Sequence, residues 1–365
     1  MNLIKQKRLR KMIAAYLTVS GLIFTSTTMP EAYTFNSLSK IISTAYAESS
    51  TPSEITANDA VKKFEEGNNL YKNGDYNGAI AKYTEAIQLK PDYDWAYNNR
   101  GIAYYNLQNY NAAIADYNKT IELNPNFAAA YNNRGFAYSQ MQKYTEAIMD
   151  YNKAIELNPK YLEAYYNRGV TYDDMGNINK AIVDYTKAIE LNPQYADAYY
   201  NRGLNYAKIG NYTQAINDCN KVILLNPNYA EAYTCRGLAY AGLQKYADAI
   251  ADYNKSIALN PNDAEAYNNR GGAYMNLQQY NQAIADFNKV IKLNSNNALA
   301  YRNRGIAYAL SGNLNQAVKD LTKAIALNPN DASAYHARGI CYESMGKNTK
   351  AQTDYAKARA LGYNG

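Results

Sequence analysis

The sequence predicts an all-α protein built as a solenoid of nine antiparallel helix pairs. Prolines recur every 34 residues, with Ser295 in the one gap, and nine copies of this length fill residues 60–365. A glycine series from Gly67 to Gly339 and an alanine series from Ala79 to Ala351 keep the same spacing. Repeats of this length are typical of stacked helical units. The prolines of the series are Pro91, Pro125, Pro159, Pro193, Pro227, Pro261 and Pro329.

Each repeat is expected to contain two helices. Apolar or small residues recur at helical spacing, as in Tyr97, Gly101 and Tyr104. Proline ends the second helix because it lacks an amide donor and clashes with the preceding turn. The glycine is expected to let the two helices approach opposite a tyrosine of the second helix. The residues expected to cap the next first helix are Asp92, Asn126 and Asn262.

This pattern resembles the tetratricopeptide repeat (TPR) family, whose period is also 34 residues. Counted from the first residue of each repeat, aromatic residues stand at positions 4 and 11, alanine at 20 and proline at 32. The resemblance implies a right-handed TPR superhelix, an α-solenoid that binds partners on its concave side. The expected repeats are 60–93, 94–127, 128–161, 162–195, 196–229, 230–263, 264–297, 298–331 and 332–365.

Position 7 departs from the leucine that is usual in the family, because it is arginine in repeats two to nine. Position 23 is aspartate in the same repeats, whereas the first repeat reverses both charges with Glu66 and Lys82. This paired reversal predicts one ion pair per repeat. We expect the pairs to be half-exposed and to contribute about 0.2–1 kcal/mol each.

The two ends of the array carry polar residues where inner repeats carry aliphatic ones. Gln352 and Arg359 occupy positions that are isoleucine or valine in the other eight repeats. A solenoid requires such polar terminal faces. The corresponding residues of the first helix are Lys62, Lys63, Glu65 and Glu66.

The N-terminal segment is typical of an export signal. Residues 1–11 are basic, residues 12–24 are apolar, and Ala45-Tyr46-Ala47 fits a cleavage site before Glu48. We therefore expect a signal peptide over 1–47, a polar linker over 48–59 and the array over 60–365. The protein is expected to be exported to the periplasm, cell surface or medium, without stable membrane insertion after cleavage. An uncleaved N-terminal anchor is the alternative.

The charge distribution disfavours nucleic acid as a partner. The formal net charge of the chain is +6. Residues 1–47 account for +5, which leaves +1 for the rest. A nearly neutral array is a poor match to a phosphate backbone.

The sequence contains no catalytic, cofactor-binding or metal-binding motif, so we expect no enzymatic activity and no cofactor. His336 is the only histidine, which excludes histidine clusters. Cys219, Cys235 and Cys341 are interpreted as isolated thiols. A Cys219–Cys235 disulfide across adjacent helices is the less favoured alternative.

Asparagine at position 6 of the first helices is the main candidate for ligand binding. Its side chain offers an acceptor and two donors, which match a peptide backbone amide. Cys235 and Ala337 interrupt the series. The simpler alternative is that asparagine is only a soluble residue at this site. The candidate residues are Asn99, Asn133, Asn167, Asn201, Asn269 and Asn303.

Two tyrosines and a group of acids are expected to modify this surface. Tyr166 and Tyr200 at position 5 would add aromatic surface to the groove. Asp173 and Asp174 lie near the end of a first helix, where the helix dipole disfavours acids. Acids at helix starts interact favourably with the helix dipole, so they are weaker evidence for ligand binding. These acids are Glu163, Asp197, Glu231 and Glu265.

These features predict a non-catalytic protein–protein interaction scaffold that binds an extended peptide or protein segment in its concave groove. The mildly acidic centre suits a basic or neutral segment. The alternative function is an exported cell-envelope module that binds glycan or a cell-wall polymer, because grooves lined by tyrosine and asparagine also suit sugars.

Overall fold

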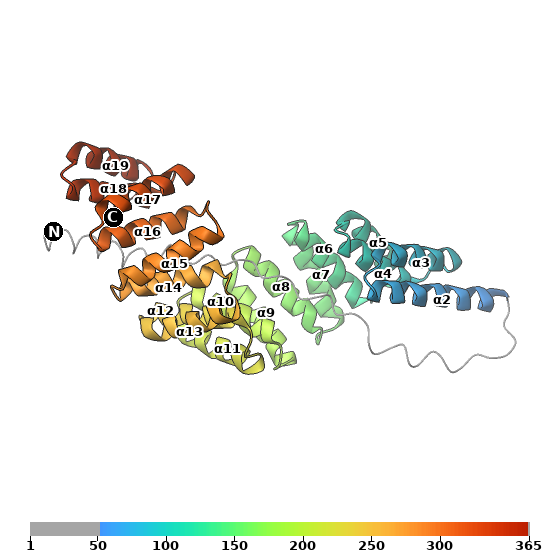
Figure 1. Cartoon of the computed structure of the whole chain (residues 1–365). Coiled ribbons are helices and arrows are strands. Elements are labelled where there is room, and N and C mark those ends of the chain that lie inside the picture. The colour runs from blue at the N-terminus through green and yellow to red at the C-terminus, as the bar shows by residue number, and fades with distance from the viewer. Residues whose placement is uncertain (1–51, 364–365) are drawn as a thin grey trace. The chain divides into compact units, whose positions relative to one another are not determined.

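The computed structural model describes residues 52–363, and every element in that range is a helix (Figure 1). The described residues divide into two compact units, 52–198 and 199–363, with the division inside α10. The first unit contains α2 (Pro52–Lys72), α3 (Tyr76–Leu89), α4 (Asp94–Asn106), α5 (Tyr110–Leu123), α6 (Ala128–Gln140), α7 (Tyr144–Leu157), α8 (Leu162–Asp174) and α9 (Ile178–Leu191). The predicted signal segment 1–47 lies outside the described residues.

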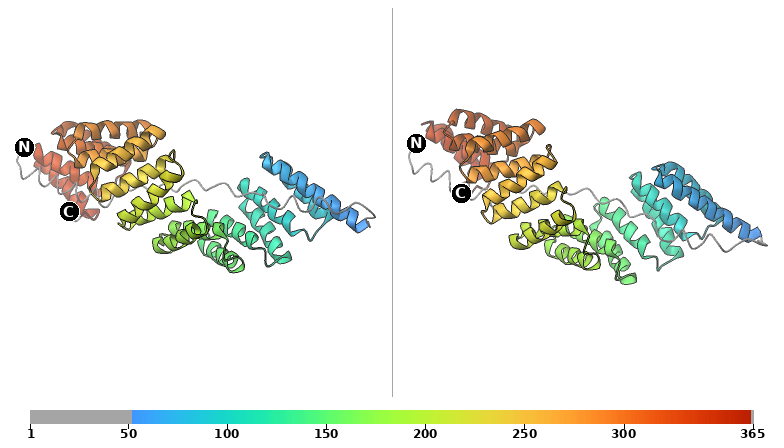
Figure 2. Two further views of the ribbon diagram at one scale, coloured as in Figure 1. Left: turned by 90° about the horizontal axis from the view of Figure 1, so that it is seen from below. Right: turned by 60° about the horizontal axis from the view of Figure 1, so that its bottom comes forward.

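The second unit continues the same alternation after α10 (Ala196–Lys208). Its helices are α11 (Tyr212–Leu225), α12 (Ala230–Gly242), α13 (Tyr246–Leu259), α14 (Ala264–Asn276), α15 (Tyr280–Leu293), α16 (Ala298–Leu310), α17 (Leu314–Leu327), α18 (Ala332–Ser344) and α19 (Asn348–Ala360). Within each unit the helices stack as antiparallel pairs, one pair per repeat, which confirms the predicted α-solenoid (Figure 2). No described helix combines the length and apolar character needed to span a bilayer.

Two details of the helix boundaries differ from the sequence predictions. Residues 52–59 of the expected linker form the start of α2, which begins at Pro52, a position where the missing amide donor costs little. The N-cap of α6 is Phe127 and that of α14 is Asp263, one residue later than predicted. Asn126 instead donates its backbone N–H to the Asn124 side chain in the preceding turn, at 3.2 Å.

The glycine of each repeat allows the two helices of a pair to pack closely. A Cβ at Gly101 would lie 2.6 Å from Cε1 of Tyr117, and one at Gly237 would lie 2.8 Å from Cε1 of Tyr253. Both tyrosines are buried. The predicted approach of glycine and tyrosine is therefore confirmed, and it recurs in both units.

The predicted arginine–aspartate pair forms within each of repeats two to nine. In the third repeat, Nε of Arg134 lies 2.8 Å from Oδ2 of Asp150, and Nη2 lies 2.6 Å from Oδ1. Nη1 also donates to Asn118 of the preceding repeat, at 2.7 Å. Hydrogen bonding to Asp150 raises the pKa of Arg134, although burial lowers it. The expectation of half-exposed pairs was wrong, because the aspartates are buried: Asp150 is 6% exposed.

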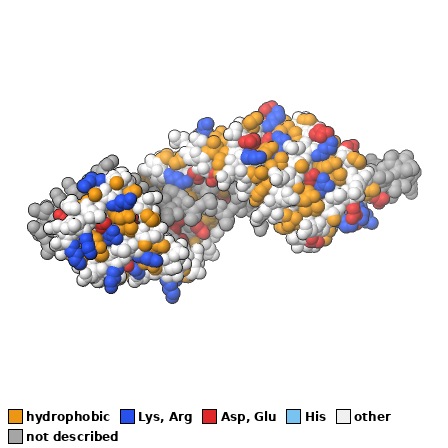
Figure 3. Space-filling model, turned by 90° about the horizontal axis from the view of Figure 1, so that it is seen from above, with side chains coloured by type: hydrophobic (Ala, Val, Ile, Leu, Met, Phe, Trp, Pro, Cys, Tyr) orange, Lys and Arg blue, Asp and Glu red, His pale blue; other side chains and the backbone are white. Residues whose placement is uncertain are grey.

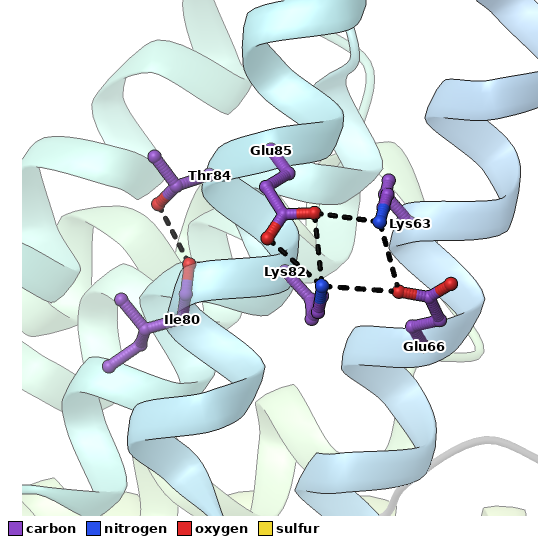
Figure 4. A network of polar contacts seen from close by, with 6 residues as sticks. All are labelled: Lys63, Glu66, Ile80, Lys82, Thr84 and Glu85. Atoms are coloured by element: carbon purple, nitrogen blue, oxygen red, sulfur yellow. Dashed lines mark hydrogen bonds and ion pairs between the residues drawn. The ribbon is translucent and has the colours of Figure 1, made fainter.

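The first repeat replaces this pair with a network of four charges. Lys82 Nζ lies 3.3 Å from Glu66 and 3.0 Å from Glu85, and Lys63 Nζ lies 2.9 Å from Glu85 (Figure 4). The reversed charges of Glu66 and Lys82 therefore meet, as predicted. At the other end, Gln352 and Arg359 are exposed on α19, as expected of a polar terminal face.

Candidate functional site

The candidate site lies on the first helices of the pairs, which contact one another in succession. In the unit 52–198 these helices are α2, α4, α6 and α8, and in the unit 199–363 they include α12, α14, α16 and α18. We call the surface that they present within each unit the first-helix face. The second helices of the pairs lie outside this row of first helices.

A continuous chain of hydrogen bonds joins six asparagines in the unit 52–198. Each side chain donates from Nδ2 to Oδ1 of the next, and the acceptor is in the same or the preceding repeat. The order is Asn167 to Asn132 at 3.1 Å, Asn132 to Asn133 at 3.5 Å, Asn133 to Asn98 at 3.1 Å, Asn98 to Asn99 at 3.1 Å, and Asn99 to Asn68 at 3.0 Å. We call this series the amide ladder.

The amide ladder uses part of the hydrogen-bonding capacity that the sequence assigned to a ligand. Asn99 is 2% exposed and therefore presents little to solvent. Asn133 and Asn167 are only partly buried. Because an asparagine side chain has two donor hydrogens and two acceptor lone pairs, each of these two retains capacity after its ladder bonds. The ladder bonds fix the orientation of the donors and acceptors that remain on these two side chains.

The two tyrosines at position 5 are buried against position 34 of the same repeat, a pairing that the sequence interpretation missed. Tyr166 contacts Tyr195 with ring centroids 4.9 Å apart, and Tyr200 contacts Tyr229 at 5.3 Å. Tyr166 is 4% exposed and Tyr200 is 7% exposed. The expectation that these rings add aromatic surface to a groove was therefore wrong.

Other repeats fill the same pair of positions with matched chemistry. In the first repeat the two positions hold Phe64 and Tyr93, whose ring centroids lie 5.1 Å apart. In the eighth repeat they hold Arg302 and Asp331, and Nη1 of the arginine lies 3.0 Å from Oδ2 of the aspartate. In these four repeats the sequence contained a usable signal, because an aromatic residue at position 5 accompanies an aromatic residue at position 34, or arginine accompanies aspartate.

Aromatic side chains that were not predicted do reach the first-helix face of the unit 52–198. Tyr105 and Phe136 stack with centroids 5.0 Å apart, and both are partly exposed. Asn106 donates to the Tyr71 hydroxyl at 2.9 Å. These residues occupy positions 9, 12 and 13 of their repeats. Several repeats have apolar or aromatic residues at these positions, and this pattern could have predicted an aromatic surface.

The predicted acids of α8 have different surroundings. Asp174 is exposed and Asp173 is partly buried. Burial raises the pKa of the neighbouring Tyr185 hydroxyl, and both carboxylates add to that shift. Their role in ligand binding stays a prediction.

The unit 199–363 has no complete ladder. Asn303 donates to Asn268 at 3.1 Å, which reproduces one ladder bond. Asn201 is 6% exposed. Nδ2 of Asn269 is buried and has no hydrogen-bond partner. The residue that corresponds to its ladder acceptor is Thr234, whose hydroxyl donates to Ser256 at 2.8 Å instead.

Glu265, one turn before Asn269 on α14, has an unusual carboxyl group. Burial raises its pKa to about 7, and the negative charge of Asp263 adds to the shift, while Asn269 opposes it. The Asp263 carboxylate caps α14 by accepting from the backbone N–H of Glu265, at 2.9 Å. Glu265 was among the acids that the sequence interpretation considered less informative.

The cysteines do not form a disulfide. Cys219, Cys235 and Cys341 are free and buried, which overturns the alternative of a Cys219–Cys235 bond. Burial raises the pKa of the Cys219 thiol, and so does its neighbour Cys235. In the described part of the chain no group of histidine, cysteine and acidic residues could hold a metal ion.

Family models match nearly all of the repeat array. The model described as tetratricopeptide repeat matches residues 95–127, 128–161, 162–195, 196–229, 230–263, 264–297 and 298–331. Related TPR models match residues 67–108 and 321–353. The chain belongs to the tetratricopeptide repeat family. TPR arrays are commonly protein-interaction scaffolds, and the paired helices described above are those of the family.

Solved TPR structures share this fold. The C-terminal part of a TPR repeat-containing protein from Cytophaga hutchinsonii is 24% identical, with a TM-score of 0.54 over 66% of this chain and 98% of that chain. The Cut9–Hcn1 hetero-tetramer of the APC/C is 19% identical, with a TM-score of 0.55 over 80% of this chain and 56% of that chain. YrrB, described as a TPR protein with an unusual peptide-binding site, is 28% identical, with a TM-score of 0.43 over 52% of this chain and 97% of that chain. No curated protein sequence matches this chain.

Proposed function

We propose that this TPR protein is a non-catalytic scaffold that binds an extended protein or peptide segment along its first-helix face. The observation that carries the proposal is the set of partly exposed position 6 asparagines, Asn133, Asn167, Asn269 and Asn303. Their remaining donors and acceptors suit the amides of an extended backbone, at about 0.5–1.5 kcal/mol for each hydrogen bond. Asn99 and Asn201 are buried and would support this surface rather than contact the ligand.

The test is a pull-down with the full chain, followed by affinity measurements on the recovered partner. Replacing Asn133 and Asn167 together by alanine should weaken binding by about 10- to 100-fold, since two backbone contacts are lost. Asn99→Ala is the matched control, because it breaks the same ladder at a buried residue. Unchanged affinity in the Asn133/Asn167 variant would contradict the proposal.

A second candidate ligand is a glycan, which Tyr105, Phe136 and the Tyr71–Asn106 pair favour. Aromatic faces with a nearby amide suit the apolar and hydroxyl surfaces of a sugar ring. Binding of purified envelope glycans by the full chain, lost in Tyr105→Ala and retained in the Asn133/Asn167 variant, would support this candidate.

We also propose that the protein is exported and that residues 1–47 are removed. The basic start, the apolar segment and the Ala45-Tyr46-Ala47 sequence support this proposal. The N-terminal residue of the protein isolated from fractionated cells should be Glu48. Recovery of the intact N-terminus in the cytoplasmic fraction would contradict it.

A further inference from the structure

The second helices of the last three repeats carry a row of lysines on one face. Positions 19, 22, 26 and 29 of each repeat are three or four residues apart, so they share one face of the second helix. In α15, α17 and α19, all in the unit 199–363, these positions hold two lysines each and no acid. Five of the six side chains are exposed, and Lys289 is partly buried. We call this set the lysine stripe; its residues are Lys289, Lys292, Lys319, Lys323, Lys350 and Lys357.

The same face of the second helices is neutral in repeats two to four. There the lysine at position 26 forms an ion pair with the glutamate at position 29. The pairs are Lys119–Glu122 at 2.6 Å, Lys153–Glu156 at 2.7 Å and Lys187–Glu190 at 2.9 Å. In repeats seven to nine position 29 is Lys292, Ala326 or Ala360, so the lysine at position 26 loses this partner.

The acids of the same three helices are already paired with arginine. Asp286, Asp320 and Asp354 are buried, and each accepts two hydrogen bonds from the arginine of its own repeat. Within residues 52–363 no ion pair joins a lysine of the stripe to a carboxylate. The ammonium groups of Lys289 and Lys350 lie over tyrosine rings at 5.7 Å, a contact that leaves their charge in place. The lysine stripe is therefore a positive surface that the described residues do not neutralise.

The distribution of charge along the array follows this difference. Residues 280–360 contain eleven basic and five acidic residues, a net charge of +6. Residues 52–198 contain fourteen basic and nineteen acidic residues, a net charge of −5. The left-hand part of the face in Figure 3 shows more basic than acidic side chains. The nearly neutral total of the array thus combines regions of opposite sign, and only the basic region attracts anions over a distance.

Three properties of the lysine stripe favour a planar anionic surface over a single anionic chain. Its six charges are spread over three helices, whereas a linear polyanion follows one groove. Lysine carries a compact charge that attracts anions without the fixed geometry of an arginine contact. None of the exposed large hydrophobic side chains lies within residues 280–360, so the stripe can contact a bilayer surface without inserting into it.

We propose that the lysine stripe binds the protein to the surface of a membrane rich in anionic phospholipids. The ammonium groups are attracted to the lipid phosphates, and each lysine near such a surface strengthens binding about fivefold. The second helices lie outside the row of first helices, so the first-helix face stays open to its ligand during this contact. The inference does not depend on what that ligand is.

Lysine acetylation by an N-hydroxysuccinimide ester, read by mass spectrometry, tests this inference on the full chain. Each lysine is followed separately, so contacts made by residues 1–47 do not obscure the result. Vesicles of phosphatidylglycerol and phosphatidylcholine in equal parts should slow the acetylation of all six stripe lysines by at least about threefold. Vesicles of phosphatidylcholine alone should not slow it. Sodium chloride at about 1 M should remove the protection, because it shortens the screening length to about 3 Å.

Two variants with the same net charge show whether the position of the lysines or the total charge matters. Glutamine replaces Lys292, Lys319, Lys323 and Lys357 in the stripe variant, and Lys119, Lys153, Lys180 and Lys187 in the control variant. The stripe variant should need more than about 100-fold more anionic lipid to protect Lys289 and Lys350, whereas the control should need less than about threefold more. Thermal unfolding checks that both variants are folded.

Equal effects of the two variants, or equal protection by the two kinds of vesicle, would overturn the inference. Absence of protection in the native chain would overturn it as well. Duplex DNA or polyphosphate that protects the stripe at a lower phosphate concentration than the vesicles would overturn the choice of a membrane. The peptide pull-down tests the proposed function separately, because its variants lie on the first helices.

Discussion

The two units of the array use the same helical scaffold but differ in how they satisfy the polar groups of their first helices. In the unit 52–198 the amide ladder connects six asparagines through five hydrogen bonds. In the unit 199–363 Thr234 stands where the ladder acceptor of Asn269 would be, and Asn269 Nδ2 is buried without a ladder bond. A repeat can therefore keep its packing while the hydrogen bonding among the polar groups of its first helices changes.

Charged side chains of both signs occur on the surface of the array. On the right-hand part of the face in Figure 3, basic and acidic side chains are interspersed with hydrophobic ones. Exposed pairs such as Lys153–Glu156 contribute little to stability. We therefore expect the important differences in stability between the units to be those in the hydrogen bonding of the first helices.

The largest expected effect tests whether the two scaffolds are equivalent. Asp150→Ala and Asp252→Ala each leave a largely buried arginine without its bidentate partner, at a cost of about 2–4 kcal/mol. Denaturant unfolding should show a similar loss for both variants. A cost confined to one unit would show that the scaffolds differ as well as the sites.

The next effect separates a complete ladder from a broken one. Asn132→Ala removes a residue that both donates and accepts within the ladder, and it should cost about 1–3 kcal/mol. Asn269→Ala removes a donor that has no partner, so its cost should be below about 0.5 kcal/mol. Equal losses in urea unfolding would contradict the distinction between the two units.

Glu265→Gln should stabilise the protein at alkaline pH, by on the order of 1–3 kcal/mol. The folded state raises the pKa of Glu265 from 4.5 to about 7, so it binds the proton more tightly than the unfolded state does. The native glutamate therefore costs stability above pH 7, and this cost disappears as the pH falls from 7 to 4.5. Unfolding free energies of both proteins at pH 8 and pH 4.5 check the sign. A destabilised variant at pH 8 would contradict the account.

The smallest effect concerns the turn within each repeat, which both units share. Gln108 and Gln244 have positive φ angles of 58° and 59°, a conformation that favours glycine. Replacing either by glycine should change stability by less than about 1 kcal/mol, in the stabilising direction and by the same amount in both units. Thermal unfolding of the two variants measures the difference, and opposite signs would be inconsistent with equivalent turns.

The sequence predicted the scaffold well because its signals repeat with one period. The reversed charges of Glu66 and Lys82 identified the ion pair, and the glycine series identified the helix contact. Burial of the aspartates was missed because exposure depends on the neighbouring repeat as well as on the pattern. The N-cap position was displaced by one residue because the asparagine before proline forms its own turn.

The candidate site was predicted less completely, because hydrogen bonding between neighbouring repeats cannot be read from one repeat. Position 6 asparagines were recognised, but not their bonds to position 5 of the preceding repeat. Tyr166 was assigned to the surface although Tyr195 covers it. Glu265 looked like an ordinary helix-start acid, and only its burial beside Asp263 distinguishes it.

The most direct test of the difference between the units is the titration of the Glu265 carboxyl group. Nuclear magnetic resonance of the full chain with ¹³C-labelled glutamate, assigned by comparison with Glu265→Gln, would follow its ionisation. The account predicts a midpoint near pH 7, because burial raises the pKa of this carboxyl group. A midpoint near the ordinary value of 4.5 would contradict it.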